Sequence, residues 1–382
     1  MSIQKLYNKN RIFVIILDLF SISNQIISRF QSRSGVFFRY RRYNTHGSFR
    51  NYYSLPPVKY CNYFSAKLLH WQNNPKFIDR RKFIVEINDH PLSAVGYYKT
   101  GLSPEMILKY VPKIRELYSL SNCVGIIFPC TKMVELFNFY FPNSNLSYKF
   151  KIIPGLGTNP KEFVFEKINF ESPLRFLCLC SDFETKGLDI VINAWLRISQ
   201  MNNGCILTIA CSNISEEYLN IIASCNSIFL INKAPLSEQE KSQLLKNHNI
   251  TIAPTHIHGG ANIFEAIEYG HAILYYEFHS SAHYEYGMEI AVPYHFYKQG
   301  YYGVKWKSIE EFMIIIKKDK QKGVFKCVED SLFNKIQLLI SQPQIAYNLG
   351  KKSFEFANYQ YSTNVRNQLL REFYQLHIAK TD

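Results

Sequence analysis

The chain has 382 residues, 47% of them hydrophobic, and a formal net charge of +14 at neutral pH. This length and apolar content predict two domains, because single hydrophobic cores stop growing at about 250–300 residues. The positive charge predicts an anionic partner and says little about the fold. The longest apolar runs are far shorter than the roughly 20 residues that cross a bilayer, so no transmembrane helix is expected.

The first apolar run, at 12–19, is predicted to be a buried strand. A basic and aromatic segment follows at 29–50 and includes Arg39, Arg41 and Arg42. Such a mixture suits nucleic acid, an anionic membrane interface, or a solvated face whose aromatic residues are partly core. No recognisable nucleic-acid reading motif accompanies it.

From residue 81 on, short apolar runs alternate with amphipathic stretches, as they do in a parallel sheet flanked by helices. The predicted elements of the first domain are, in chain order, a strand at 82–87, a helix at 103–121 with Ser103 as N-cap and Pro104 in its first turn, a strand at 123–128, a helix at 130–141, and a strand and Pro/Gly turn at 148–157.

After a polar connector at 159–171 the alternation restarts. The predicted elements are a strand at 174–180, a helix at 187–199, a strand at 205–211, a helix from Ser215, a strand at 227–231, a helix at 261–269 that Gly270 stops, an irregular segment at 275–302, and helices within 331–377. The last helix, with Ser362 as N-cap, is predicted to form an apolar stripe of Val365, Leu369, Phe373 and Leu376. Two successive βα runs predict two Rossmann-like domains with a cleft between them.

The first βα turn of the second domain suits a bound phosphate. Its strand runs into Ser181 and Asp182, and Lys186 and Gly187 stand just before the next helix. A lysine at the carboxyl end of a parallel strand, beside a helix N-terminus, can hold a phosphate. The alternative is a solvated loop lysine followed by a glycine that starts a helix, and this segment alone favours the alternative.

A second segment, HIHGGANIFEAIEYG, suits the same ligand. Gly259 and Gly260 can bring bare backbone N–H groups against a diphosphate, and Glu265, about one turn into the following helix, can accept hydrogen bonds from two sugar hydroxyls. The alternative is a tight turn with a carboxylate that only stabilises the helix. Together, at the ends of different strands, the two segments predict a nucleotide diphosphate site.

The stretches FLCLCSDFETKGLDIVINAW, LTIAC and IAPTHIHGGANIFEAIEYGHAIL resemble the C-terminal domain of retaining glycosyltransferases of family 4, which have the GT-B fold. The resemblance covers 83–274 and the C-terminal helix, while the first eighty residues match poorly. It implies an α/β GT-B chain of three parts: residues 1–152 as an N-terminal Rossmann-like acceptor domain, 153–358 as a C-terminal Rossmann-like nucleotide-sugar-binding domain, and 359–382 as a helix that packs back on the N-terminal domain.

The resemblance also implies roles for single residues. Lys186 would contact the diphosphate of the donor, and Glu265 would bind its ribose. The predicted donor site comprises Ser181, Asp182, Lys186, Gly259, Gly260, Ala261, Asn262 and Glu265. The predicted catalytic residues are Lys186, His258 and, from the stretch VEINDHPL, His90. Asn88 is the rival to His90 by alignment, and a structural role for a histidine before proline is the alternative. Two positions depart from the family: Ser181 replaces a usual arginine, and Ile257 replaces the first of two usual glutamates.

The implied reaction is transfer of a sugar from a nucleoside diphosphate sugar to a glycan or lipid-linked acceptor, with retention, in surface polysaccharide synthesis. No cofactor and no metal are expected, because the cysteines and histidines lack zinc-like spacing and no Asp-x-Asp motif is convincing. The protein is expected in the cytoplasm, with its basic segment against the anionic inner face of the membrane and without nucleic acid as a partner. A catalytically silent GT-B protein that binds a nucleotide or glycan is the alternative, which the two departures favour.

Overall fold

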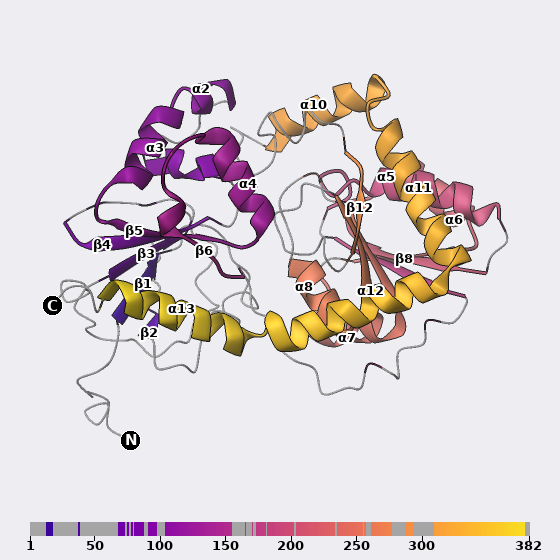
Figure 1. Cartoon of the computed structure of the whole chain (residues 1–382). Helices are drawn as coiled ribbons and strands as arrows, with labels where there is room; N and C mark the ends of the chain where they lie inside the picture. Colours follow the sequence, from indigo (N-terminus) through magenta and orange to yellow (C-terminus); the bar gives the residue numbers. More distant parts are fainter. Residues whose placement is uncertain are drawn as a thin grey trace. The chain divides into compact units, whose positions relative to one another are not determined.

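The computed structural model describes residues 13–17, 37–38, 68–72, 75, 78, 80–87, 91–97, 104–154, 165, 170, 173–180, 182–201, 204–233, 235–254, 256, 261–276, 287–292 and 309–378. The chain divides into two compact units, Met1–Gly157 with Thr363–Asp382, and Thr158–Ser362. Each unit is built on a six-stranded parallel sheet flanked by helices (Figure 1). Within the described segments, no helix combines the length and apolarity that crossing a bilayer requires.

The sheet of unit 1 has the strand order β2-β1-β3-β4-β5-β6. Its strands are β1 (Phe13–Leu17), β2 (Phe37–Phe38), β3 (Leu68–Gln72), β4 (Lys82–Glu86), β5 (Cys123–Phe128) and β6 (Phe150–Ile152). Its helical elements are the 3-10 helix η3 (Pro91–Tyr97), α2 (Pro104–Leu108), α3 (Val111–Ser119), α4 (Thr131–Tyr140), the 3-10 turn η4 (Ser147–Lys149) and α13 (Thr363–Ile378). Strand β5 has the predicted bounds, and β4 and α4 match their predictions to within one residue.

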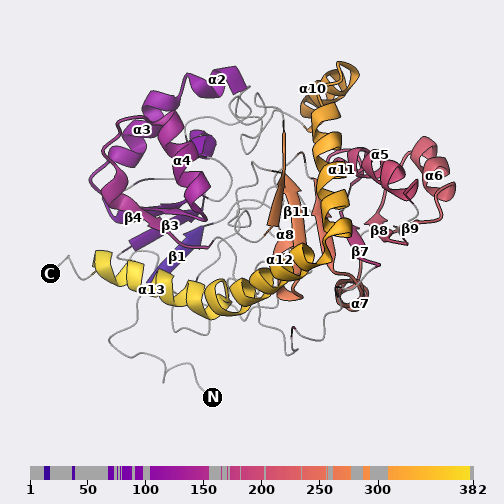
Figure 2. The same ribbon diagram turned by 45° about the vertical axis from the view of Figure 1, so that its right-hand side comes forward.

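Helix α13 lies along one face of this sheet, opposite α3 and α4 (Figures 1 and 2). Its Leu370, Phe373 and Tyr374 are buried in one cluster with side chains of β3, β4 and β5. The close approach depends on Gly125 of β5, because a Cβ there would lie 2.6 Å from the ring of Phe373. The end of the chain therefore belongs to the core of the first unit.

The buried face of α13 differs from the predicted stripe. Leu376 is 58% exposed, whereas Leu370, Tyr374 and Arg366 are buried. The prediction placed the stripe by apolar character alone. It was wrong for Leu376 and missed Arg366, whose charge is matched inside the unit by Glu86. Phe373 is buried as predicted, and Leu369 packs against the same cluster.

The helix predicted at 103–121 is two helices, α2 and α3, separated by a turn at Lys109 and Tyr110. Pro112 stands in the first turn of α3. A proline has no N–H and its ring crowds the preceding turn, so it suits a helix start and interrupts a longer helix. The prediction of one continuous helix overlooked this residue.

The sheet of unit 2 has the strand order β12-β11-β10-β7-β8-β9. Its strands are β7 (Arg175–Leu179), β8 (Ile206–Cys211), β9 (Ile228–Asn232), β10 (Ile250–Ala253), β11 (Ala272–Tyr276) and β12 (Gly287–Ile290). Its helices are α5 (Leu188–Ser199), α6 (Glu216–Ala223), α7 (Glu238–Asn247), α8 (Ala261–Glu268), α10 (Ile309–Gln321), α11 (Lys326–Ser341) and α12 (Pro343–Glu355), followed by the π-helical turn η7 (Phe356–Gln360).

The predicted elements between 174 and 231 agree with β7, α5, β8, α6 and β9 to within one residue at each described end. Helices α5 and α11 pack together on one side of the sheet, and α8 and α12 pack together on the other (Figure 1). The buried core between these layers contains Phe176, Trp195 and Tyr276. Unit 2 thus has a three-layer arrangement, helices over both faces of a parallel sheet.

The segment predicted to be irregular, 275–302, contains ordered strand structure. Tyr275 and Tyr276 complete β11, and Gly287–Ile290 forms β12, which pairs in parallel with β11. β12 is a four-residue edge strand, and only its last residue, Ile290, is buried. So short a segment shows no alternation from which a strand can be predicted, and its pairing with β11 decides its structure.

Candidate functional site

The strand order of unit 2 changes direction between β7 and β10. β8 and β9 extend the sheet from β7 on one side, and β11 and β12 extend it from β10 on the other. In open α/β sheets, ligands bind outside the carboxyl ends of the strands at such a switch point. The two segments predicted to bind the diphosphate follow directly from the carboxyl ends of β7 and β10.

Asp182 organises the turn between β7 and α5. Its Oδ1 accepts hydrogen bonds from the backbone N–H of Thr185 at 2.8 Å and from the Thr185 hydroxyl at 2.6 Å. Gly187, the N-cap of α5, has a φ of 64°, and a Cβ there would lie 2.6 Å from the carbonyl oxygen of Pro254. Glycine is therefore required both by the left-handed backbone and by the space. The turn presents Lys186 directly before α5.

Lys186 is half-buried beside the first turn of α5. Burial lowers the pKa of its ammonium group from 10.5, and the nearby Cys180 and Asp182 only partly oppose the shift. A partly desolvated ammonium group gains from a neighbouring negative charge, and the start of a twelve-residue helix adds partial positive charge at the same place. The turn is therefore suited to an anion.

Two hydrogen bonds join this turn and β7 to the segment that leads into α8. The backbone N–H of His256 donates to the carbonyl oxygen of Thr185 at 3.1 Å. The Nδ2 of Asn262, in the first turn of α8, donates to the carbonyl oxygen of Leu179 at 2.8 Å. The structure thus brings the turn that carries Lys186 and the start of α8 to one edge of the sheet.

The ring of His256 is fully buried behind this turn. It contacts the rings of Tyr276 and Phe325 at centroid distances of 5.9 and 5.1 Å, and neither of its nitrogens has a hydrogen-bond partner among the described residues. Burial, and then the charges of Lys320 and Lys186, hold its pKa well below 6.5. The ring is therefore neutral at physiological pH and does not compete with Lys186 for an anion.

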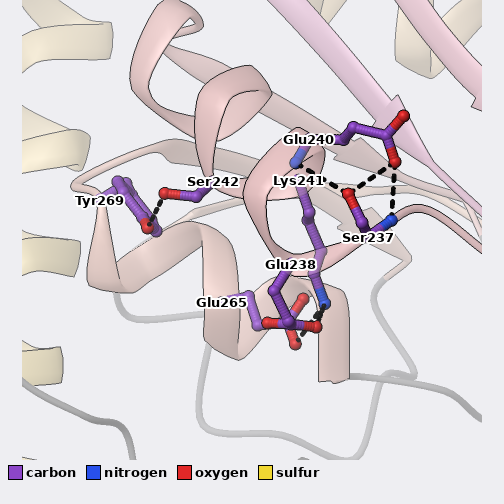
Figure 3. Close-up of polar contacts among 7 residues, drawn as sticks. All are labelled: Ser237, Glu238, Glu240, Lys241, Ser242, Glu265 and Tyr269. Atoms are coloured by element: carbon purple, nitrogen blue, oxygen red, sulfur yellow. Dashed lines mark hydrogen bonds and ion pairs between the residues drawn. The ribbon is translucent and has the colours of Figure 1, made fainter.

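Glu265 lies one turn into α8 and is 7% exposed. Its Oε1 accepts a hydrogen bond from Nζ of Lys241 in α7 at 3.1 Å, and the same ammonium group lies 3.2 Å from Oε1 of Glu238. One residue further along α7, the hydroxyl of Ser242 bonds with that of Tyr269 at 2.8 Å. Figure 3 shows these contacts between the two helices.

The start of α7 is held by its own hydrogen bonds. Ser237 accepts from the backbone N–H of Glu240, and the Glu240 carboxylate accepts from the backbone N–H of Ser237, which is a capping box (Figure 3). Hydrogen bonds from Lys233 and then from Ser237 lower the pKa of Glu240 to about 2. The first turn of α7 is therefore stabilised independently of the contact between Lys241 and Glu265.

Of the predicted site residues, Asp182, Lys186, Asn262 and Glu265 are fully described, and all four lie in unit 2 at β7, α5 and α8. Ala261 is the first residue of α8, and its side chain lies outside the described part. The predictions for Ser181, His258, Gly259, Gly260 and His90 also fall outside the described residues. In the part of the chain that the structure describes, no three His, Cys, Asp or Glu side chains gather as metal ligands do.

Sequence analysis missed Lys241 and Thr185. Lys241 and Glu265 are 24 residues apart in the sequence, and no local sequence pattern predicts a contact between two helices. One signal would have located the start of α7. Ser237 and Glu240 have the spacing of a capping box, which marks a helix N-terminus. Thr185 donates its hydroxyl to Asp182 and accepts from His256 through its carbonyl oxygen, and the second role cannot be predicted from the side-chain type.

No protein-family model matches the sequence, and no curated protein matches it either. Among solved structures, the chain is similar to a glycosyltransferase from Rickettsia africae ESF-5, with a TM-score of 0.56 and 10% identity over 98% of this chain and 100% of that chain. It is also similar to WaaG, a glycosyltransferase involved in lipopolysaccharide biosynthesis, with a TM-score of 0.50 and 14% identity over 94% of this chain and 99% of that one. The chain has the GT-B fold.

A further GT-B structure adds a ligand-bound comparison. The pneumococcal O-GlcNAc transferase GtfA, solved with UDP and GlcNAc, has a TM-score of 0.50 and 12% identity over 82% of this chain and 57% of its own length. The GT-B fold confirms the α/β architecture with two parallel sheets that the sequence predicts. At these identities the similarity establishes the fold, and membership of family 4 and retention stay predictions.

Proposed function

We propose that this GT-B protein is a glycosyltransferase that moves a sugar from a nucleoside diphosphate sugar to a glycan or lipid-linked acceptor with retention. The observation that carries the proposal is the hydrogen bond from His256 N–H to Thr185 O, which joins the Lys186 turn to the segment leading into α8. It supports one anion site at the switch point of the sheet, where the phosphates of a nucleotide bind. The UDP in the GtfA complex supports a nucleotide donor.

In this proposal each part of the site has one task. Lys186, Ser181 and the amides at the start of α5 bind the diphosphate, and Asp182 serves the donor site by holding the turn through Thr185. Gly259, Gly260 and Ala261 lie against the diphosphate and the transferred sugar, Asn262 fastens the start of α8 to β7, and Glu265 binds the ribose. His90 and His258 are proposed as further catalytic residues at the transferred sugar.

The proposed chemistry follows from where charge develops. Breaking the bond between sugar and diphosphate leaves growing negative charge on the leaving phosphates, so hydrogen-bond donors placed there stabilise the transition state more than the ground state. The Lys186 ammonium group and the helix-start amides supply positive charge, so the proposal requires neither a metal nor another cofactor. Undiminished transfer in the presence of EDTA is the expected result.

Donor hydrolysis with a panel of nucleotide sugars tests the proposed reaction. One donor is expected to be cleaved by the wild-type protein, with Lys186→Ala lowering kcat by roughly 100-fold or more, the size typical of removing one such donor. Glu265→Ala is expected mainly to raise KM for the donor, because it removes ground-state binding. Saturable nucleotide binding without cleavage or transfer would establish the silent GT-B alternative, and binding of no nucleotide would contradict both.

The site of action is proposed to be the cytoplasmic face of the membrane, in surface polysaccharide synthesis. The basic segment 29–50, most of which lies outside the described residues, would bind anionic lipid headgroups, consistent with the net charge of +14. Co-sedimentation with vesicles should rise with the phosphatidylglycerol fraction and fall with salt. Binding that ignores lipid charge would contradict this part of the proposal, and no salt-dependent binding to oligonucleotides is expected.

A further inference from the structure

We propose that Lys241 is a positioning residue of the donor site. It holds the carboxylate of Glu265 so that one oxygen is occupied by the lysine and the other is presented to the ribose hydroxyls of the nucleotide. This inference rests on the proposed function, because it assigns a partner to the residue that binds the ribose there. The contact that carries it joins α7 to α8 (Figure 3).

Among the described residues, a hydrogen-bond partner is found for one oxygen of the Glu265 carboxylate. Nζ of Lys241 donates to Oε1 at 3.1 Å, and no hydrogen bond from a described residue reaches Oε2. The Glu265 side chain is 10% exposed, so little water is available to fill the remaining acceptor positions. An ionised carboxylate can accept about four hydrogen bonds, and the open oxygen is therefore available to a pair of hydroxyl groups.

Lys241 is placed between two carboxylates of unequal exposure. Its side chain is 18% exposed, its Glu265 partner is nearly buried, and its other partner, Glu238, is 71% exposed. Water screens the exposed pair strongly and the buried pair weakly. Of these two ion pairs, the pair with Glu265 is the less screened, and Glu238 provides a control for the loss of a neighbouring charge.

The two helices are also joined without Lys241. Ser242 bonds with Tyr269 at 2.8 Å, and the capping box of Ser237 and Glu240 holds the start of α7. Loss of the Lys241 ammonium group therefore leaves the helices together and frees the carboxylate alone. A freed carboxylate without its counter-charge is no longer held in one direction, and this weakens its hydrogen bonds to a ligand.

The discriminating measurement is the preference for ribose over deoxyribose. Affinities of UDP, ADP and GDP and of their 2′-deoxy counterparts are measured by calorimetry, since the deoxy ligands lack one hydroxyl that Glu265 would bind. The wild-type protein is expected to prefer the ribonucleotide by about 10-fold, the value of one hydrogen bond to a charged group. Lys241→Met and Lys241→Gln are expected to reduce this preference to about 2-fold or less, as is Glu265→Gln.

Three matched variants separate positioning from packing. Lys241→Arg keeps the charge, Glu238→Gln removes only the exposed partner, and Ser242→Ala breaks the other bond between α7 and α8. All three are expected to keep the ribose preference. If Ser242→Ala abolishes it as fully as Lys241→Met does, Lys241 acts through helix packing and the inference is wrong. An unchanged preference in Lys241→Met and Lys241→Gln overturns it as well.

The outcome for the wild-type protein distinguishes the two proposals. Binding of none of the six nucleotides overturns the proposed function, and this inference falls with it. Binding of a diphosphate that depends on Lys186 but shows no ribose preference overturns this inference alone. Thermal unfolding of each variant shows whether it is folded, and the two different Lys241 substitutions keep the test informative if one of them is not.

Discussion

Arg366 of α13 donates from Nη2 to Oε1 of Glu86 in β4 at 3.0 Å, across 280 positions of the sequence. Its Nε donates to the carbonyl oxygen of Pro154 at 2.7 Å. Oε2 of Glu86 lies 3.1 Å from Nε2 of His70, whose Nδ1 bonds with the hydroxyl of Tyr374 at 2.6 Å. The four side chains are at most 1% exposed. This buried network fastens the end of the chain to the sheet of unit 1.

Removing one charge from this network should destabilise unit 1 strongly. Glu86→Leu leaves the buried Arg366 without its carboxylate, and an uncompensated buried charge costs about 3–5 kcal/mol. Urea unfolding should show this loss in the free energy of unfolding. The double variant Glu86→Leu with Arg366→Met should lose less than the single one, because it leaves no charge behind. A Glu86→Leu protein as stable as the wild type would show that the network contributes nothing to the core.

Gly187→Ala should cost more stability than its backbone angle explains. An added Cβ meets the carbonyl oxygen of Pro254 at 2.6 Å, in addition to the left-handed φ of 64°. Gly323→Ala is the matched control, because Gly323 has a φ of 72° and no atom within 4 Å of the added Cβ. The expected losses are about 1 kcal/mol for Gly323→Ala and roughly 3 kcal/mol for Gly187→Ala. Equal losses, measured by thermal unfolding, would mean that the turn adapts to a side chain.

Nucleotide binding should weaken as the pH rises through the lowered pKa of Lys186. The ammonium form binds a diphosphate and the neutral amine does not, so affinity is full below this pKa and falls above it. Lys186→Arg should abolish this alkaline decrease, because a guanidinium stays protonated. Calorimetry with UDP from about pH 7 to about pH 10 measures both proteins. An identical decrease in the arginine variant would assign the pH dependence to another group.

His271 should make the stability of unit 2 depend on mildly acidic pH. Its Nδ1 bonds with the Thr251 hydroxyl at 2.8 Å, its Nε2 bonds with the Leu245 carbonyl oxygen at 2.7 Å, and burial lowers its pKa from 6.5 to about 4. Since the unfolded state takes up the proton first, stability is full above pH 6.5 and falls as the pH drops towards 4, by about 3 kcal/mol in total.

The matched variant for this prediction is His271→Gln. It should be less stable than the wild type at about pH 7.5, but should lose about 2–3 kcal/mol less on going to about pH 4.5. Urea unfolding at the two pH values measures the difference. His248 and His256, whose pKa values are also lowered by burial, destabilise both proteins at acidic pH. The quantity compared is therefore the loss of unfolding free energy between the two pH values in each protein. Equal losses of unfolding free energy in the two proteins would show that His271 does not contribute to the acid destabilisation.

The elements of unit 2 that the sequence predicts have local signals, whereas α7, β10 and α10 were not predicted. Buried strands such as β7 and β8 are continuous apolar runs, and α5 shows apolar positions at helical spacing after Gly187. The same reasoning failed where one residue overrides a pattern, as Pro112 does between α2 and α3, or where a partner strand decides, as β11 does for β12. Periodicity shows at which spacing apolar residues recur along the chain, and it does not show which residues of other elements they contact.

By itself, the sequence determined the succession of strands and helices and the presence of a lysine turn and a carboxylate helix at the ends of different strands. Only the tertiary structure decided that the lysine turn is hydrogen-bonded to the segment before α8. It also decided that Glu265 forms an ion pair with Lys241 and that Arg366 is a core residue. The physical reason is distance along the chain. Secondary structure follows from residues a few positions apart in the sequence. The energy of a buried charge depends on a partner that is distant in the sequence and that only the tertiary fold places next to it.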